Sequence, residues 1–347
     1  MNAPQLLPLE YPFPALPPPG EAIAVAPGVL WIRMPLPFAL DHINLWLLAG
    51  HDGWTIVDCG YGDAGTRALW EAHLAGAMQG RPVKRIIATH YHPDHLGNAR
   101  WLMERFHCPV AMTQAEFLTA HAVLEQRATH AFADTFALFA AHGMAKEFVS
   151  GLASRGNHYR TGVPDVPDVF ERMLDGDNMD AGDASWRVIC GYGHSPEHAS
   201  LYSAERGLLI SGDMLLPRIS TNVSAGAAEP DGDPLARFLA SLATFEALPP
   251  ETLVLPSHGL PFRGIAPRTS QLAAHHAARL AELEAAIGAA LAPVSASDML
   301  PILFRRELDL QQRFFAMGEA IAHLNYLWHR GRIRRTVAAG GAIRFSG

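Results

Sequence analysis

Short apolar runs separated by Gly and Asp dominate the first part of the chain and predict β-strands. Three such runs, rich in Val, Ile, Leu and Trp, predict an opening meander. Apolar residues at helical spacing follow them, and from there the predicted strands and helices alternate, which is typical of an α/β fold. The predicted strands cover residues 29–36, 44–49, 54–59, 84–89 and 109–112, and the predicted helices cover 64–78 and 98–106.

The pattern changes after residue 112. Residues 113–155 are helical in character almost throughout, which predicts a helical lid inserted at about 113–170. Strands then return, and the last part of the chain is predicted to be three helices and a hairpin. The later strands are predicted over 186–192, 207–211 and 252–255, and the helices over 234–248, 268–291, 296–304 and 316–330.

This pattern divides the chain into three predicted parts. Residues 1–24 form an extended Pro-rich arm, because proline opposes regular helix. Residues 25–266 form the catalytic domain, and residues 267–347 form a small C-terminal domain. The charge supports two units: the net charge is −7, but ten Arg against six Asp and Glu give residues 267–347 a charge of +4, which leaves −11 for the rest.

The composition indicates an ordinary globular protein. At 347 residues and 49% hydrophobic, the chain can bury a large core. Its longest apolar runs are far shorter than the roughly 20 residues of a membrane helix, so no membrane partner is expected. The N-terminus lacks the basic and apolar regions of a signal peptide, and the three cysteines have no metal-ligand spacing. A cytoplasmic protein with reduced thiols is predicted.

One loop carries four polar residues of a kind that bind metals. His90, His92, Asp94 and His95 follow the predicted strand 84–89 directly. Imidazole nitrogens and carboxylate oxygens bind borderline divalent ions, and four such residues within six positions suggest two ions.

Three more residues of the same kind stand at the ends of later strands. His194, Asp213 and His258 each follow a predicted strand directly. Because the carboxyl ends of such strands meet at one edge of a sheet, these side chains are expected to converge with the first cluster. His198 is expected to be structural or to support a ligand.

These residues carry a resemblance to a known family. His90-Tyr-His-Pro-Asp-His95 resembles the H-x-H-x-D-H motif of the metallo-β-lactamase superfamily, and the three later residues match the family's remaining ligands over roughly residues 25–265. The resemblance implies a four-layer αβ/βα sandwich. Asp58 matches the family's early aspartate, which supports the metal loop. The implied ligands are His90, His92 and His194 for one ion and Asp94, His95 and His258 for the other, with Asp213 bridging the two.

The ligand set is most similar to those of glyoxalase II, the lactonases and the tRNA-processing nucleases. It implies a binuclear hydrolase in which a metal-bridging hydroxide attacks a small-molecule thioester or ester, with Asp94 and Asp213 as catalytic residues. Two Zn²⁺ ions are favoured, and iron or manganese suit the same ligands. A thioester is the least demanding substrate because a thiolate leaves without much help from an acid.

Two alternatives remain open. A lactone or organophosphate hydrolase would need a proton donor near the metals, for which Tyr159 and Tyr192 are the candidates. An endoribonuclease would need a surface that binds nucleic acid, and the C-terminal domain could supply one.

The C-terminal domain resembles a winged helix, and it is similar to the C-terminal domain of a β-lactamase-like subgroup that contains hydrolases and some endoribonucleases. Arg330, Arg332, Arg334 and Arg335 would contact phosphates if this domain bound nucleic acid. Alternatively, they pack against the catalytic domain or a second subunit of a homodimer. The acidic remainder of the chain favours packing, and a small molecule is the expected partner.

Overall fold

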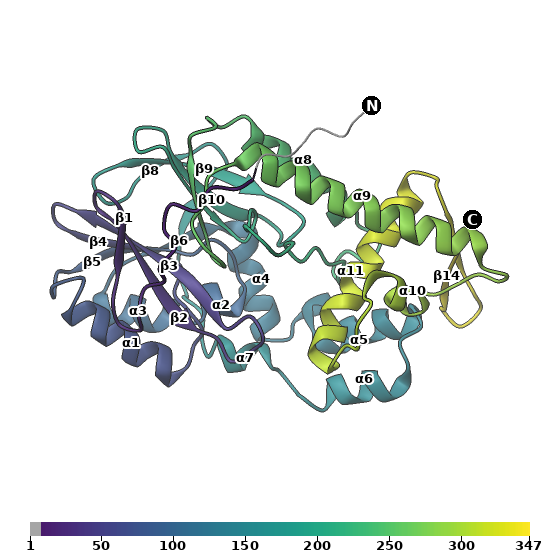
Figure 1. Ribbon diagram of the computed structural model, residues 1–347. Coiled ribbons are helices and arrows are strands. Elements are labelled where there is room, and N and C mark those ends of the chain that lie inside the picture. The colour runs from purple at the N-terminus through teal and green to yellow at the C-terminus, as the bar shows by residue number, and fades with distance from the viewer. Residues whose placement is uncertain (1–7) are drawn as a thin grey trace.

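A seven-stranded sheet forms one half of the α/β part of the computed structural model, which describes residues 8–347 (Figure 1). Its strands lie in sequence order. The first four pair antiparallel, as the predicted meander requires, and the last four pair parallel. The strands are β1 (Ile23–Ala26), β2 (Val29–Pro35), β3 (His42–Gly50), β4 (Gly53–Val57), β5 (Val83–Ile87), β6 (Val110–Thr113) and β7 (Glu171–Met173).

A five-stranded sheet forms the other half, with β11 and β12 parallel and the remaining neighbours antiparallel. The two sheets share one apolar core that contains Trp31, Trp46 and Trp186, each at most 1% exposed. Helices α1 (Ala64–Ala75) and α3 (Ala99–Phe106) pack on the first sheet and α8 (Pro234–Glu246) on the second. The strands are β12 (Leu253–Pro256), β11 (Leu208–Gly212), β10 (His198–Ser203), β9 (Ser185–Gly191) and β8 (Asn178–Asp180).

These layers confirm the α/β sandwich, but several predicted elements are wrong in detail. Strands β1, β7, β8 and β10 were not predicted, because the first three have only three or four residues and β10 is rich in small and polar residues. The last long helix begins at Leu310 rather than at residue 316. Asp309 and Gln312 form a capping box there, which satisfies the backbone N–H groups of an otherwise polar first turn.

Within residues 113–155, predicted to be helical in character almost throughout, the structure has several separate helices. The insertion consists of short helices joined by turns, and Gln126 and Ala128 have the positive φ angles of 53° and 47° that end a helix. Gly143, with a φ of 88°, separates the next two helices. The helices are α4 (Gln114–Leu124), a 3₁₀ turn (Ala128–His130), α5 (Phe132–Ala141), α6 (Lys146–Ala153) and α7 (Tyr159–Gly162).

The C-terminal segment packs onto the insertion and the second half of the sandwich. Its helices lie beside α5, α6 and α8 (Figure 1). They share a second apolar core with these three helices, and that core includes Phe139, Phe238 and Leu324. Although two of these helices are long, no helix within residues 8–347 is long and apolar enough to cross a membrane. The elements are α9 (Ile265–Ala289), α10 (Ala296–Leu303), α11 (Leu310–His329), β13 (Arg334–Val337) and β14 (Ile343–Ser346).

The described part of the predicted N-terminal arm, residues 8–24, contains no helix, and its last two residues belong to β1. Glu10 pairs with the backbone of Arg263, so this part of the arm lies against the second half of the sandwich. Residues 1–7 of the predicted arm lie outside the described residues.

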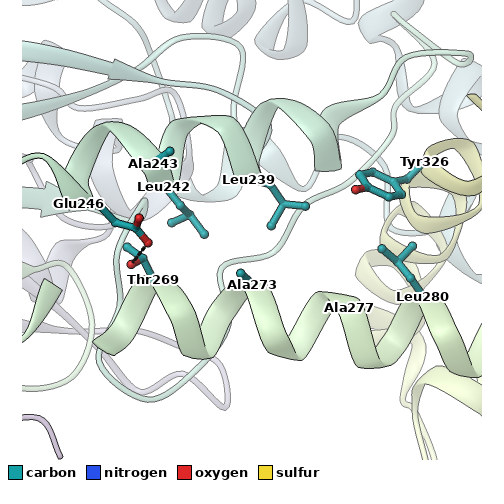
Figure 2. A pocket seen from close by; sticks show the side chains of 9 residues that line it. All are labelled: Leu239, Leu242, Ala243, Glu246, Thr269, Ala273, Ala277, Leu280 and Tyr326. Atoms are coloured by element: carbon teal, nitrogen blue, oxygen red, sulfur yellow. Dashed lines mark hydrogen bonds between the residues drawn. The ribbon is translucent and has the colours of Figure 1, made fainter. Parts of the chain in front are cut away.

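A pocket of about 310 Å³ lies between α8 and α9 (Figure 2). Its walls are mostly Leu and Ala side chains, and Thr269 Oγ1 donates to Glu246 Oε1 (2.5 Å) at one end. Tyr326 of α11 closes the other end. None of the seven predicted metal ligands lines this pocket, so it is separate from the predicted metal centre.

Candidate metal centre

The structure brings the seven predicted ligands together at the carboxyl ends of four strands. The loop with His90 and His92 follows β5 and leads into the short helix α2 (Pro93–Leu96), while later ligands follow β9, β11 and β12. Their ligand atoms form three overlapping groups, and within each group all ligand atoms lie within 4.8 Å of one another. The groups are His90 with His92 and His194, His90 with His95 and Asp213, and Asp94 with His95 and His258.

The distances divide the cluster into two halves that Asp213 joins. His90 Nε2 lies 2.8 Å from His92 Nδ1 and 3.2 Å from His194 Nε2. In the other half, His258 Nε2 lies 3.4 Å from Asp94 Oδ2. Asp213 directs Oδ2 at His194 Nε2 (3.5 Å) and Oδ1 at His258 Nε2 (3.3 Å). This is the placement that a bridging carboxylate needs.

Two buried polar atoms in the centre show that these residues fit a metal. Among the described residues, His95 Nε2 and Asp213 Oδ1 have no hydrogen-bond partner, although both are inaccessible to water. A buried polar atom without a partner is costly, and a cation between these nitrogen and oxygen atoms would satisfy them. Three imidazoles on one side and two imidazoles with a carboxylate on the other suit two borderline divalent ions.

Acceptors outside the centre fix how the imidazoles face it. His194 Nδ1 donates to the carbonyl of Asn222 and His258 Nδ1 to the carbonyl of His42, both at 2.8 Å. His95 Nδ1 donates to Asp58 Oδ2, also at 2.8 Å, so Asp58 holds the imidazole of His95. Because these partners only accept, each Nδ1 carries a proton, which leaves Nε2 as the atom of each ring that can bind a metal.

The charges in the centre favour a cation. Burial lowers the pKa of His92 to about 3 and that of His90 well below its usual range, so both imidazoles are neutral. Burial would raise the pKa of Asp213, but His258 and His95 outweigh it and hold that pKa well below its usual range. Burial lowers the pKa of His258, but Asp213 and Asp94 reverse this and raise it to about 10. The carboxylates therefore draw positive charge into the centre.

The two tyrosines that were candidates for a proton donor differ in their exposure to solvent. Tyr159 is 4% exposed, and its hydroxyl donates to the carbonyl of Tyr91 at 2.6 Å. The hydroxyl proton is thus engaged with the backbone between His90 and His92, which holds the metal loop in place. Tyr192 lies just before His194 and is 39% exposed.

Strand β3 supports the centre in a way that the sequence analysis missed. Asn44 Nδ2 donates to the carbonyls of Pro256 (2.9 Å) and Gly259 (2.8 Å), on either side of His258. The neighbouring His42 accepts from Gly259 N through its Nε2 (3.0 Å). A buried asparagine within an otherwise apolar strand was the signal for this role.

Glu116 of α4 is a second support that the sequence analysis missed. Its carboxylate accepts from Tyr91 N (3.0 Å), Ser195 Oγ (2.6 Å) and Glu197 N (2.7 Å), so it joins the loop of His90 to the loop of His194. Burial raises its pKa to about 7 despite these donors. Glu in the first turn of a helix is common on surfaces, so the sequence alone gave no signal that this one is buried.

Replacing Glu116 by Ala is expected to destabilise the fold and loosen the metal centre. The change leaves up to three buried donors without an acceptor, so we expect the free energy of unfolding to fall by about 1–3 kcal/mol or more. Urea denaturation of the metal-free protein measures this loss. Glu104→Ala, which removes an exposed carboxylate from α3, serves as the control and should change stability by less than about 0.5 kcal/mol. Equal stability of the two variants would contradict this role.

Comparisons with known proteins agree with this geometry. The profile of the Metallo-beta-lactamase superfamily matches residues 39–258, and that of the Metallo-beta-lactamase-like C-terminal domain matches residues 280–347. The crystal structure of a beta-lactamase domain protein from Burkholderia ambifaria is similar, with 47% identity and a TM-score of 0.90 over 97% of this chain and 98% of that one.

Two relatives known from their sequences are more distant. A probable metallo-hydrolase of Bacillus subtilis is 24% identical over 86% of this chain and 92% of its own length. A hydroxyacylglutathione hydrolase of Idiomarina loihiensis is 21% identical over 63% of this chain and 62% of its own length.

Proposed function

Because the chain belongs to the metallo-β-lactamase superfamily and is a metal-dependent hydrolase of that fold, we propose that it hydrolyses a small-molecule thioester or ester with two divalent metal ions. Zinc is the metal we propose, and iron or manganese suit the same ligands. The observation that carries the proposal is the position of Asp213, whose two oxygens face the two halves of the cluster separately.

Metal ions at such a centre lower the pKa of bound water toward neutrality and polarise a carbonyl oxygen. The protein's own residues prepare the centre for this chemistry. Asp94 and Asp213 supply the negative charge that compensates two cations, and Asp58 and the carbonyls of His42 and Asn222 hold the imidazoles in the metal-binding tautomer.

The environment of Tyr159 supports a thioester rather than a lactone or phosphoester. A thiol with a pKa of about 8.5 leaves as a thiolate with little help, whereas an alkoxide needs a proton from an acid. The Tyr159 hydroxyl donates to a backbone carbonyl and is therefore engaged elsewhere. The resemblance to a hydrolase named for hydroxyacylglutathione, an acyl derivative of a thiol, points the same way.

The contacts of three of the four C-terminal arginines support packing rather than nucleic-acid binding. Arg330 Nη1 lies 2.7 Å from Asp233 Oδ2, and Arg335 Nη1 lies 2.6 Å from Asp231 Oδ1. Arg332 pairs with Glu284. Charges already paired within the chain contribute little to phosphate binding, so the endoribonuclease remains the second candidate.

A homodimer and a cytoplasmic location also remain proposals. The three buried free cysteines support the cytoplasmic location.

Loading the protein with Zn²⁺ and removing the excess is expected to leave two ions per chain. Chelation should then abolish hydrolysis and lower the melting temperature, because a ligand at 100 times its Kd stabilises a fold by about 2.7 kcal/mol. Elemental analysis and thermal denaturation measure the two effects. One ion per chain at saturation would contradict the binuclear centre.

The substrate class is tested on this same loaded protein. An acyl-thioester, a lactone, an aryl phosphotriester and single-stranded RNA are compared, and the thioester is expected to give the highest kcat/KM. Cleavage of RNA without turnover of any small ester would overturn the proposal in favour of the endoribonuclease.

A further inference from the structure

The loop between β11 and α8 fixes the positions of two of the candidate ligands. It begins at Asp213, whose carbonyl accepts from Thr221 Oγ1 at 2.5 Å. Further along, the carbonyl of Asn222 accepts from His194 Nδ1 at 2.8 Å. The positions of Asp213 and His194 therefore depend on the path of residues 213–225, which form no helix or strand of their own.

Helix α11 of the C-terminal segment holds the far end of this loop. The carbonyl of Gly318 accepts from Ala225 N at 3.0 Å. Next to it, Glu319 Oε2 accepts from Asn222 Nδ2 at 3.4 Å, a long hydrogen bond. Ser224 Oγ donates to Asn222 Oδ1 at 2.7 Å, so the Asn222 side chain is held on both sides.

Helix α9 holds the first part of the same loop. Arg268, which is 7% exposed, donates to the carbonyls of Leu216 (2.5 Å) and Ile219 (2.7 Å). Both long helices of the C-terminal segment are thus bonded to a loop that contacts the metal centre.

Gly318 shows that the contact with α11 is close. A Cβ atom at this position would lie 2.7 Å from both Cβ and Oγ of Ser224, a distance at which something must shift. Gly318 is buried within a long helix, where Gly is about 1 kcal/mol less favourable than Ala. Its φ is not positive, so the backbone does not require glycine. The close approach of the loop is therefore the physical reason why a glycine stands at position 318.

We propose that α11 is a positioning element of the metal centre: Gly318 holds Ala225 and leaves room for Ser224, Glu319 holds Asn222, and the carbonyl of Asn222 holds His194 in its ligand tautomer and orientation. This inference rests on the proposed metal-dependent function. It assigns α11 a larger part in the affinity for the ion at His90, His92 and His194, because His194 is the ligand that Asn222 holds, than in the affinity for the ion at Asp94, His95 and His258.

The test uses the full chain and Zn²⁺ alone, with affinities from competition against a chromophoric chelator. Gly318→Ala is expected to lower the affinity for one of the two Zn²⁺ ions by about 10–100-fold, which is the range for loss of an outer partner of a metal ligand. The affinity for the other ion should stay within about threefold of the wild-type value. Gly288→Ala is the matched control, because it lies in α9 and a Cβ there meets nothing within 4 Å. It should leave both affinities unchanged.

Glu319 provides an independent variant if Gly318→Ala fails to fold. Glu319→Ala removes the acceptor for Asn222 Nδ2 and should lower the affinity for the same single ion. Glu319→Gln keeps an acceptor oxygen, so its affinities for both ions should stay within about threefold of the wild-type values. Unchanged affinities in Gly318→Ala or Glu319→Ala, or equal weakening of both ions, would overturn this inference. A wild-type protein that does not bind two ions would instead overturn the proposed function.

Discussion

Replacing Asp213 by Asn is expected to lower kcat by about 10²-fold or more while the protein keeps its fold, since removal of one preorganised electrostatic group has effects of that size. Asp213 faces His194 with one oxygen and His95 and His258 with the other. An amide carries no charge and presents an NH₂ group on one side, so it compensates two cations poorly and places N–H donors where a ligand oxygen is needed.

Steady-state kinetics and elemental analysis of Asp213→Asn measure this effect, and circular dichroism checks the fold. Asp168→Asn is the control, because Asp168 is an exposed carboxylate that pairs with Arg100 and belongs to none of the three ligand groups. Its kcat should match that of the wild type. Wild-type turnover in Asp213→Asn would show that hydrolysis does not need a charged bridge.

The sequence predicted the convergence of ligands well because the signal is local and repeated. His90 to His95 lie within six positions, and His194, Asp213 and His258 each stand directly after a strand. The strands β9, β11 and β12 point the same way in one sheet, so their carboxyl ends share an edge and bring distant residues together. The α/β class followed from the same alternation of strands and helices.

The supports of the ligands could not be predicted, because most of them are backbone carbonyls or partners far away in sequence. The carbonyls of His42 and Asn222 belong to residues with no special sequence pattern, yet they fix two imidazoles. Glu116 and Gly318 act through contacts that depend on how helices pack on loops, and apolar periodicity does not give that packing. Asp58 was the exception, since the resemblance to a family identified it.

Replacing Asp58 by Asn is expected to lower the affinity for one of the two metal ions by about 10–100-fold, which is the range for loss of an outer partner of a metal ligand. Asp58 Oδ1 accepts from Thr89 N and Thr89 Oγ1, and Oδ2 accepts from His95 Nδ1. In the variant, the amide oxygen is expected to face Thr89, which leaves the NH₂ group facing His95. His95 Nδ1 must then accept, its proton moves to Nε2, and the lone pair that faces the centre is lost.

The backbone does not prevent this substitution. Asp58 has a φ of 63°, a left-handed conformation that Asn also adopts readily, so the change tests the tautomer of His95 rather than backbone strain. Asp63→Asn is the control, because Asp63 caps α1 through Thr66 N and Asn is an equally good cap. Competition with a chelator should show weak binding of the ion at Asp94, His95 and His258 in Asp58→Asn alone, and kcat should fall with it. Two tightly bound ions in that variant would mean that the Asp58 carboxylate does not set the tautomer of His95.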